Sequence, residues 1–215
     1  MNRPDLVIFD CDGVLVDTEP VSNAVLAQNL TRHGLPLSTE DCIVKFTGWS
    51  MINVEQEAIR LGATLPKNWI ATVYAEEFEA LKRGVDAVKG IPEILDRLES
   101  LYIPFCVASN GSEEKMAITL GQTGLFPRFE GAMFSAHTLN TSKPDPALFQ
   151  AALAAFNMEP ARAVVIEDSV LGATGAARAN IPCYGFAPHH AGADLAATGA
   201  KVFKEMRELP ELLGF

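Results

Sequence analysis

Residues 6–17 read LVIFDCDGVLVD, in which an apolar run leads into two aspartates, one residue apart, and then a glycine. Such a run predicts a buried strand, and side chains two positions apart on a strand point the same way. We therefore expect Asp10 and Asp12 to face one small volume, where unpaired carboxylates imply a divalent cation, a shared proton, or both. Gly13 permits a sharp backbone turn just beyond them. The alternative is an ordinary aspartate-rich turn, and later segments decide between the two.

The overall composition is that of a globular protein. The chain has 215 residues, 48% of them hydrophobic and 20% charged, enough for a large core in one domain or in a domain with an insertion. Its formal net charge is −10 and it has no basic run, so nucleic acid is a poor candidate for a partner. A small anionic substrate stays possible, because one local lysine can oppose the overall charge.

The cysteines and the first residues of the chain indicate the cellular compartment. The cysteines are scattered, with no CxxC or Cys/His cluster, which predicts free thiols in a reducing compartment. The opening residues MNRPD lack the apolar run of a signal peptide, and no apolar stretch is long enough to cross a membrane. We expect a cytoplasmic monomer with no membrane partner.

The pattern after residue 90 alternates between strands and helices. Apolar runs predict strands at 104–109, 131–135, 163–167 and 181–186. Helical patterns lie at 91–101, 112–123, 146–156 and 169–180. This alternation predicts an α/β fold, a Rossmann-like parallel sheet flanked by helices. In such open sheets, ligands bind beyond the carboxyl ends of the strands.

The segment from about residue 19 to residue 85 shows helical patterns without a strand pattern. These patterns cover residues 21–33, 39 onward, 51–61 and 66–83. They predict an all-helical insertion at 18–85, with residues 1–17 and 86–215 forming the α/β core. The joining segments near 17–19 and 84–90 are expected hinges.

Polar residues follow three further predicted strands. Ser109 and Asn110 precede a helix, whose N-terminal N–H groups attract anions. Lys143 stands before two prolines that stiffen its loop. Glu167 and Asp168 end an otherwise apolar strand. Each alone could be an ordinary helix cap, solvated lysine or surface acid. Together with Asp10 and Asp12, they supply a nucleophile, an acid/base, phosphate-binding groups and metal ligands for phosphoryl transfer.

With these motifs the chain resembles the haloacid dehalogenase superfamily of phosphohydrolases. DCDGVLVD at 10–17 is similar to its first motif, Ser109 to its second, Lys143 to its third, and Glu167 with Asp168 to its fourth. The helical insertion resembles the alpha-helical cap of the subgroup that contains beta-phosphoglucomutase and bacterial sugar-phosphate phosphatases. Relatives in that subgroup act on 6-phosphogluconate or 2-deoxyglucose 6-phosphate, and nothing in the sequence selects between such substrates.

The resemblance implies a Mg²⁺-dependent phosphatase that hydrolyses a small phosphate monoester, a sugar or sugar-acid phosphate, through an aspartyl-phosphate. Asp10 would be the nucleophile, and Asp12 would protonate the leaving alcohol and then activate water. Asp10, the backbone carbonyl of Asp12, and Asp168, with or without Glu167, would hold the Mg²⁺, which suits an all-oxygen ligand set better than zinc does. Asp12 is expected to have no positively charged neighbour, which would favour its protonated form.

The same resemblance implies the substrate-binding residues. Ser109 and Lys143 would bind the transferring phosphoryl group, with Asn110 nearby. Thr18 and Thr47 are candidate substrate-binding residues of the insertion, and Thr18 would also lie at the hinge and position the acid/base. The implied partner is a small phosphorylated metabolite, because a cap that closes over the site excludes macromolecules.

Three positions distinguish the possible activities, because related enzymes with different reactions carry different residues there. The dehalogenases lack an aspartate at the position of Asp12, since their reaction has no alcohol leaving group to protonate. The phosphoglucomutases carry a cap histidine where this chain has Ser22, and an arginine where Met51 follows residues 48–50. These departures favour hydrolysis over a mutase reaction. A non-catalytic protein that binds a phosphorylated ligand is a further alternative, but every predicted catalytic position holds a competent residue.

Overall fold

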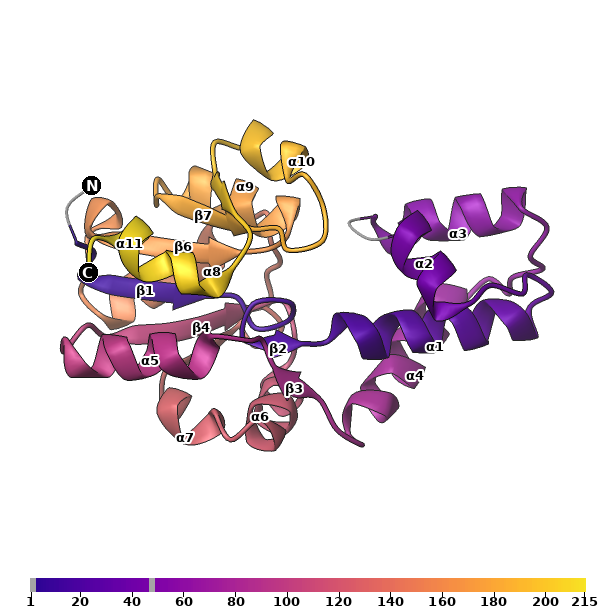
Figure 1. Cartoon of the computed structure of the whole chain (residues 1–215), viewed down its shortest axis with the longest axis horizontal. Coiled ribbons are helices and arrows are strands. Elements are labelled where there is room, and N and C mark those ends of the chain that lie inside the picture. Colours follow the sequence, from indigo (N-terminus) through magenta and orange to yellow (C-terminus); the bar gives the residue numbers. More distant parts are fainter. Residues whose placement is uncertain (1–2, 47–48) are drawn as a thin grey trace. The chain divides into compact units, whose positions relative to one another are not determined.

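Strand β1 (Leu6–Phe9) lies inside the sheet, and its side chains are fully buried. This computed structural model describes residues 3–46 and 49–215, and in that part of the chain six parallel strands run in the order β5-β4-β1-β6-β7-β8 (Figure 1). The other strands are β4 (Phe105–Ser109), β5 (Met133–Ser135), β6 (Ala163–Glu167), β7 (Cys183–Phe186) and β8 (Lys201–Phe203). The predicted α/β fold with a parallel sheet is confirmed.

Helices cover both faces of this sheet (Figure 1). They are α5 (Ile91–Ser100), α6 (Glu113–Gln122), α7 (Phe126–Phe129), α8 (Ala147–Ala155), α9 (Val170–Arg178), α10 (Ala193–Ala197) and α11 (Leu209–Leu213). Ile8 of β1 packs with Phe149 of α8 and Ala176 of α9 in one buried cluster. On the opposite face, the ring centroids of Phe105 and Phe129 lie 5.2 Å apart. Alternate strand residues therefore serve two separate cores.

The structure departs from the predicted strands in two places. Strand β8 extends the sheet beyond the segment at 181–186, which the sequence pattern had suggested as the last strand. A small antiparallel sheet pairs β2 (Val16–Asp17) with β3 (Asp86–Ala87), where hinges were expected. Strands β2 and β3 have only two residues each, too few for an alternating pattern, and β8 begins with an exposed lysine.

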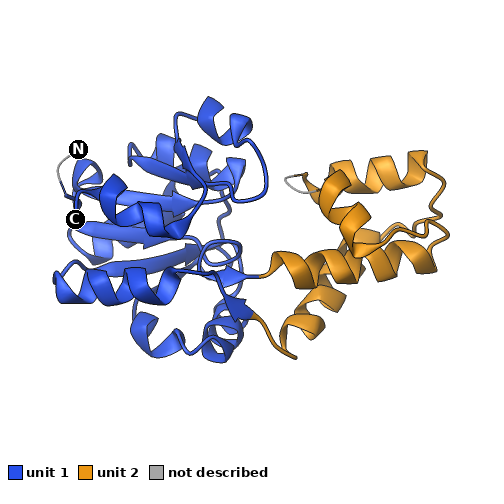
Figure 2. Cartoon of the chain, in the orientation of Figure 1, with its two compact units in different colours: residues 1–17, 86–215 blue, residues 18–85 orange. Residues whose placement is uncertain are grey.

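The chain forms two compact units (Figure 2). Unit 1 comprises residues 1–17 and 86–215, and unit 2 comprises residues 18–85. Unit 2 contains α1 (Glu19–Arg32), α2 (Thr39–Phe46), α3 (Met51–Arg60) and α4 (Trp69–Leu81). Its own core surrounds the fully buried Trp69. Across the described residues, no helix is both long enough and apolar enough to span a lipid bilayer.

A buried hydrogen-bond chain stabilises unit 2. The Trp69 indole Nε1 donates to Asn29 Oδ1 at 2.6 Å, and Asn29 Nδ2 donates to Glu76 Oε2 at 3.0 Å. Arg32 forms an ion pair with the same glutamate. Because Asn29 is fully buried, its amide provides both partners without help from solvent.

We expect Asn29→Ala to lower the free energy of unfolding by about 1–3 kcal/mol, because the Trp69 N–H would be left buried and unpaired. Urea unfolding followed by tryptophan fluorescence measures this change. Asn53→Ala, at an exposed position of α3, is the matched control and should stay within about 0.5 kcal/mol of wild type. Equal stabilities of the two variants would show that the hydrogen-bond chain does not stabilise the unit.

Candidate active site

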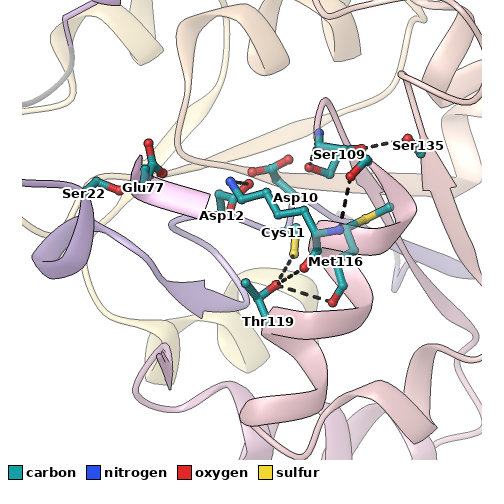
Figure 3. Close-up of polar contacts among 12 residues, drawn as sticks. Asp10, Cys11, Asp12, Ser22, Glu77, Ser109, Met116, Thr119 and Ser135 are labelled. Atoms are coloured by element: carbon teal, nitrogen blue, oxygen red, sulfur yellow. Dashed lines mark hydrogen bonds and ion pairs between the residues drawn. The ribbon is translucent and has the colours of Figure 1, made fainter. Parts of the chain in front are cut away.

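Parallel strand register brings the predicted residues of unit 1 to one edge of the sheet. Phe9 is paired with Val107 of β4 and Ile166 of β6, and the Asp10 N–H donates to the Ile166 carbonyl at 2.9 Å. The residues that follow these pairs leave the sheet at the same edge. Figure 3 shows Asp10 and Asp12 there, with Cys11 directed instead toward Thr119 of α6.

Lys143 lies between two carboxylates. Its Nζ is 2.5 Å from Asp10 Oδ1 and 2.6 Å from Glu167 Oε1, and its side chain is only 3% exposed. Burial lowers the pKa of this ammonium, but the carboxylates of Asp10 and Glu167 raise it more, so the pKa lies above its usual value. Lys143 therefore remains positively charged at neutral pH.

Asn110 holds the loop that carries Lys143. The Lys143 backbone N–H donates to Asn110 Oδ1 at 2.8 Å. The sequence suggested that Asn110 lies near a bound phosphoryl group, and the structure gives its side-chain oxygen this second task of fixing the loop. Its contact with Lys143, 33 residues away, has no signature in the sequence.

Ser109 ends β4 and is 2% exposed. Its Oγ accepts a hydrogen bond from the Gly111 N–H at 3.0 Å, so the Ser109 hydroxyl proton is available to an anion. Ser135 Oγ donates to the Gly111 carbonyl at 2.7 Å, which fixes the loop from the neighbouring strand. Sequence reasoning missed Ser135, although its place at the end of a predicted strand was a usable signal.

The acids form a compact cluster. Asp10, Glu167 and Asp168 each offer a carboxylate oxygen, and these oxygens lie within 4.8 Å of one another. Burial raises the pKa of Asp10 to about 7, opposed by Lys143 and assisted by Glu167 and Asp12. Burial, followed by the charges of Asp10 and Glu167, raises the pKa of Asp168 well above its usual value. Such a set of mutually repelling oxygen donors suits a hard divalent cation.

Glu167 is already engaged through both of its oxygens. Oε1 accepts from Lys143 Nζ, and Oε2 accepts from the backbone N–H and the hydroxyl of Ser169 at 2.9 and 2.8 Å. The carboxylate packs against Gly172 of α9, where an added Cβ would lie 1.7 Å from Oε1. Glu167 thus fixes Lys143 and the start of α9, and Asp10 and Asp168 are the better placed acids for a metal ion.

Two features of the structure favour glycine at position 13. Its φ of +76° is in the left-handed region, which disfavours other residues. A Cβ at Gly13 would also lie 2.0 Å from Asp168 Oδ2. The turn after Asp12 therefore allows the backbone to approach Asp168, the metal-ligand candidate that directly follows β6.

Asp12 has a positively charged neighbour, so the expectation that it lacks one was wrong. Lys115 Nζ of α6 lies 3.0 Å from Asp12 Oδ2. The two residues are 103 positions apart, and only the fold brings them together. Lys115 is a residue of the site that sequence reasoning missed.

The two candidates of the insertion, Thr18 and Thr47, belong to unit 2. Thr18 is buried and stands at the N-terminus of α1, where its carbonyl accepts from the Ser22 N–H at 2.9 Å. Thr47 lies outside the described residues. Both stay predictions as substrate-binding residues.

Comparisons with known proteins identify relatives of this chain. A family model described as haloacid dehalogenase-like hydrolase matches residues 7–186. The chain is 28% identical to 6-phosphogluconate phosphatase of Escherichia coli K12, with 99% of this chain and 96% of that protein aligned. A crystal structure of a haloacid dehalogenase-like protein from Agrobacterium tumefaciens matches with a TM-score of 0.87 and 32% identity, covering 97% of each chain.

A second solved structure is a hydrolase of the same family from Deinococcus radiodurans, with bound phosphate and sodium. It matches with a TM-score of 0.84 and 28% identity, covering 99% of this chain and 96% of that one. The family model covers well over half of the chain and includes every acidic residue of the cluster. The chain belongs to the haloacid dehalogenase-like hydrolases, and its curated relatives include phosphatases.

Proposed function

We propose that this protein is a Mg²⁺-dependent phosphatase that hydrolyses a small phosphate monoester through a covalent phosphoryl group on Asp10. The observation that carries the proposal is the buried ion pair of Asp10 with Lys143. The lysine favours the ionised, nucleophilic form of Asp10 and offers a fixed positive charge to an incoming phosphoryl group.

The chain's own residues account for both halves of the reaction. The Asp10 carboxylate attacks phosphorus, the bond from phosphorus to the ester oxygen breaks, and Asp12 gives its proton to the departing alkoxide. Asp12 then takes a proton from water as that water attacks the phosphorus of the aspartyl-phosphate. Inorganic phosphate leaves and the Asp10 carboxylate is restored.

Ser109 and Lys143 bind the phosphoryl oxygens throughout. The Ser109 hydroxyl donates a hydrogen bond, and the Lys143 ammonium opposes the negative charge that builds up as the nucleophile approaches. Both side chains are buried and held by neighbours, so little reorganisation is needed when the substrate arrives.

Asp10, Asp168 and the backbone carbonyl of Asp12 would hold the Mg²⁺. The all-oxygen donor set and the raised pKa values of the two carboxyls support this assignment. The bound ion would supply positive charge that offsets the repulsion between Asp10 and the phosphoryl oxygens.

Added Mg²⁺ is expected to raise the melting temperature of the wild-type protein, since a ligand at 100 times its Kd stabilises the fold by about 2.7 kcal/mol. Asp168→Asn should remove most of that shift, because it removes one of the charged metal ligands. Asp194→Asn, at an exposed site on α10, is the matched control and should keep the full shift. Differential scanning calorimetry with EDTA and with Mg²⁺ measures both. A full shift in Asp168→Asn would remove Asp168 from the metal site.

A sugar or sugar-acid phosphate is the proposed substrate class. Support comes from the relative whose name states that it acts on 6-phosphogluconate, and from the net charge of −10, which opposes polyanionic substrates. Ser22 and Met51 stand where the mutases have histidine and arginine, and Ser22 Oγ donates to Glu77 Oε1 at 2.9 Å within unit 2. These neutral residues support hydrolysis rather than phosphoryl transfer between sugar positions.

Phosphate release from a panel of phosphorylated metabolites and p-nitrophenyl phosphate tests the proposal. We expect Mg²⁺-dependent turnover that EDTA abolishes, with the largest kcat/KM among sugar and sugar-acid phosphates. Beta-glucose 1-phosphate with its bisphosphate activator should yield inorganic phosphate rather than glucose 6-phosphate. A protein that binds these compounds without turnover at any pH or metal concentration would instead be a binding protein.

A further inference from the structure

We propose that Lys115 is a positioning residue, which holds the Asp12 carboxyl group through Oδ2 in the orientation that lets its other oxygen give a proton to the leaving group. The inference rests on the proposed phosphatase function and assigns a residue outside the four sequence motifs. Lys115 Nζ lies 3.0 Å from Asp12 Oδ2, and the side chains are only 23% and 30% exposed. An ion pair sheltered to this degree restrains both partners more than a fully solvated pair would.

The two oxygens of Asp12 have different surroundings. Oδ2 accepts the hydrogen bond from Lys115, whereas Oδ1 is buried and has no hydrogen-bond partner within the part of the chain that the structure describes. A buried polar atom without a partner is costly and usually has a functional explanation. With Oδ2 anchored, Oδ1 is the oxygen available to exchange a proton with the substrate.

The position of Lys115 on its helix supports a specific role. It lies in the first turn of α6, where its N–H is bound to the cap oxygen of Ser112 at 3.2 Å. A positive charge at a helix N-terminus opposes the helix dipole, and the neighbouring Glu113 and Glu114 are the residues that this location favours. The helix dipole therefore does not favour a lysine here, and the ion pair with Asp12 is a favourable contact that this lysine makes.

The Lys115 side chain also passes the loop that presents Ser109. An added Cβ at Gly111 would lie 3.3 Å from Ser109 Oγ, 3.5 Å from Lys115 Cδ and 3.9 Å from Asp12 Oδ2. The phosphate-binding hydroxyl, the lysine stem and the proposed acid thus converge on one glycine. Lys115 therefore lies close both to the acid and to the group proposed to hold the phosphoryl oxygens.

Substrates with different leaving groups test this role, because a general loss of protein stability would lower activity on both substrates equally. An alkyl alkoxide requires a proton as it departs, whereas p-nitrophenolate leaves readily without one. We expect Lys115→Met to lower kcat/KM for an alkyl phosphate, such as the best metabolite of the panel, by about tenfold more than kcat/KM for p-nitrophenyl phosphate. Asp12→Asn should show the same selective loss, and Lys115→Arg should restore most of the alkyl phosphate activity.

The controls separate this inference from the function on which it rests. Lys89→Met, at an exposed lysine of unit 1, should match wild type with both substrates. If Lys115→Met does not fold, Lys115→Gln keeps the stem and a donor without the charge, and the same selective loss is expected. Equal losses on both substrates, no loss, or no rescue by arginine would overturn the positioning role. Wild-type protein without any turnover, or Asp10→Asn with full turnover, would instead overturn the phosphatase proposal.

Discussion

Asp10→Asn is expected to lower kcat for every phosphate monoester that the wild-type protein hydrolyses by at least about 10³-fold. The amide nitrogen and oxygen are poor nucleophiles, and the substitution removes the charge that pairs with Lys143 at 2.5 Å. Since Asn is close in size to Asp and Lys143 keeps its contact with Glu167, the fold should persist. Initial rates of phosphate release measure the loss, and urea unfolding confirms that the variant is folded.

Asp194→Asn is the matched control for this change, because it removes one exposed carboxylate far from the cluster in sequence. It should retain the wild-type rate within about twofold. A folded Asp10→Asn protein that keeps more than about a hundredth of the wild-type kcat would show that another residue is the nucleophile.

Lys143→Met is expected to lower the free energy of unfolding by about 3–5 kcal/mol in EDTA at neutral pH. The methionine fills a similar volume but leaves Asp10 and Glu167 buried without the ammonium that contacts both. Activity should be lost as well, because the phosphoryl group loses its fixed positive charge. Urea denaturation and the phosphate-release assay measure the two effects.

A double variant distinguishes the structural from the catalytic contribution of Lys143. Adding Glu167→Gln removes one of the uncompensated charges while keeping an acceptor for Ser169, so it should recover a substantial part of the lost stability. It should not recover activity. If the double variant is no more stable than Lys143→Met, charge burial is not the cause of the destabilisation.

Residues placed directly at strand ends could be predicted from the sequence. The apolar runs identify β1, β4 and β6, and parallel strands end at a common edge, so the meeting of Asp10, Glu167 and Asp168 follows from local patterns. The same reasoning placed Ser109 at the end of a strand at this edge. What it could not give was the engagement of Glu167 with Lys143, because Lys143 reaches the cluster from a loop whose path depends on tertiary contacts.

Contacts between segments that are distant in the sequence could not be predicted from local sequence patterns. The pairing of Lys115 with Asp12 depends on how α6 packs beside the sheet. Neither segment has a sequence pattern that predicts contact with the other. The strand β8 was missed because it has only three residues, of which the first is an exposed lysine and only Phe203 is buried. Periodicity reports which face of an element is buried, and it does not report which element covers that face.

Chemical trapping of the intermediate tests the central claim most directly. Wild-type protein is mixed with its best substrate and Mg²⁺, quenched in acid during turnover, and reduced with borohydride, which converts an aspartyl-phosphate to homoserine. We expect peptide mass spectrometry to find homoserine at position 10, and to find none in Asp10→Asn or in protein without substrate. Homoserine in place of another aspartate would contradict the account. So would active turnover at the time of quenching with no homoserine at position 10.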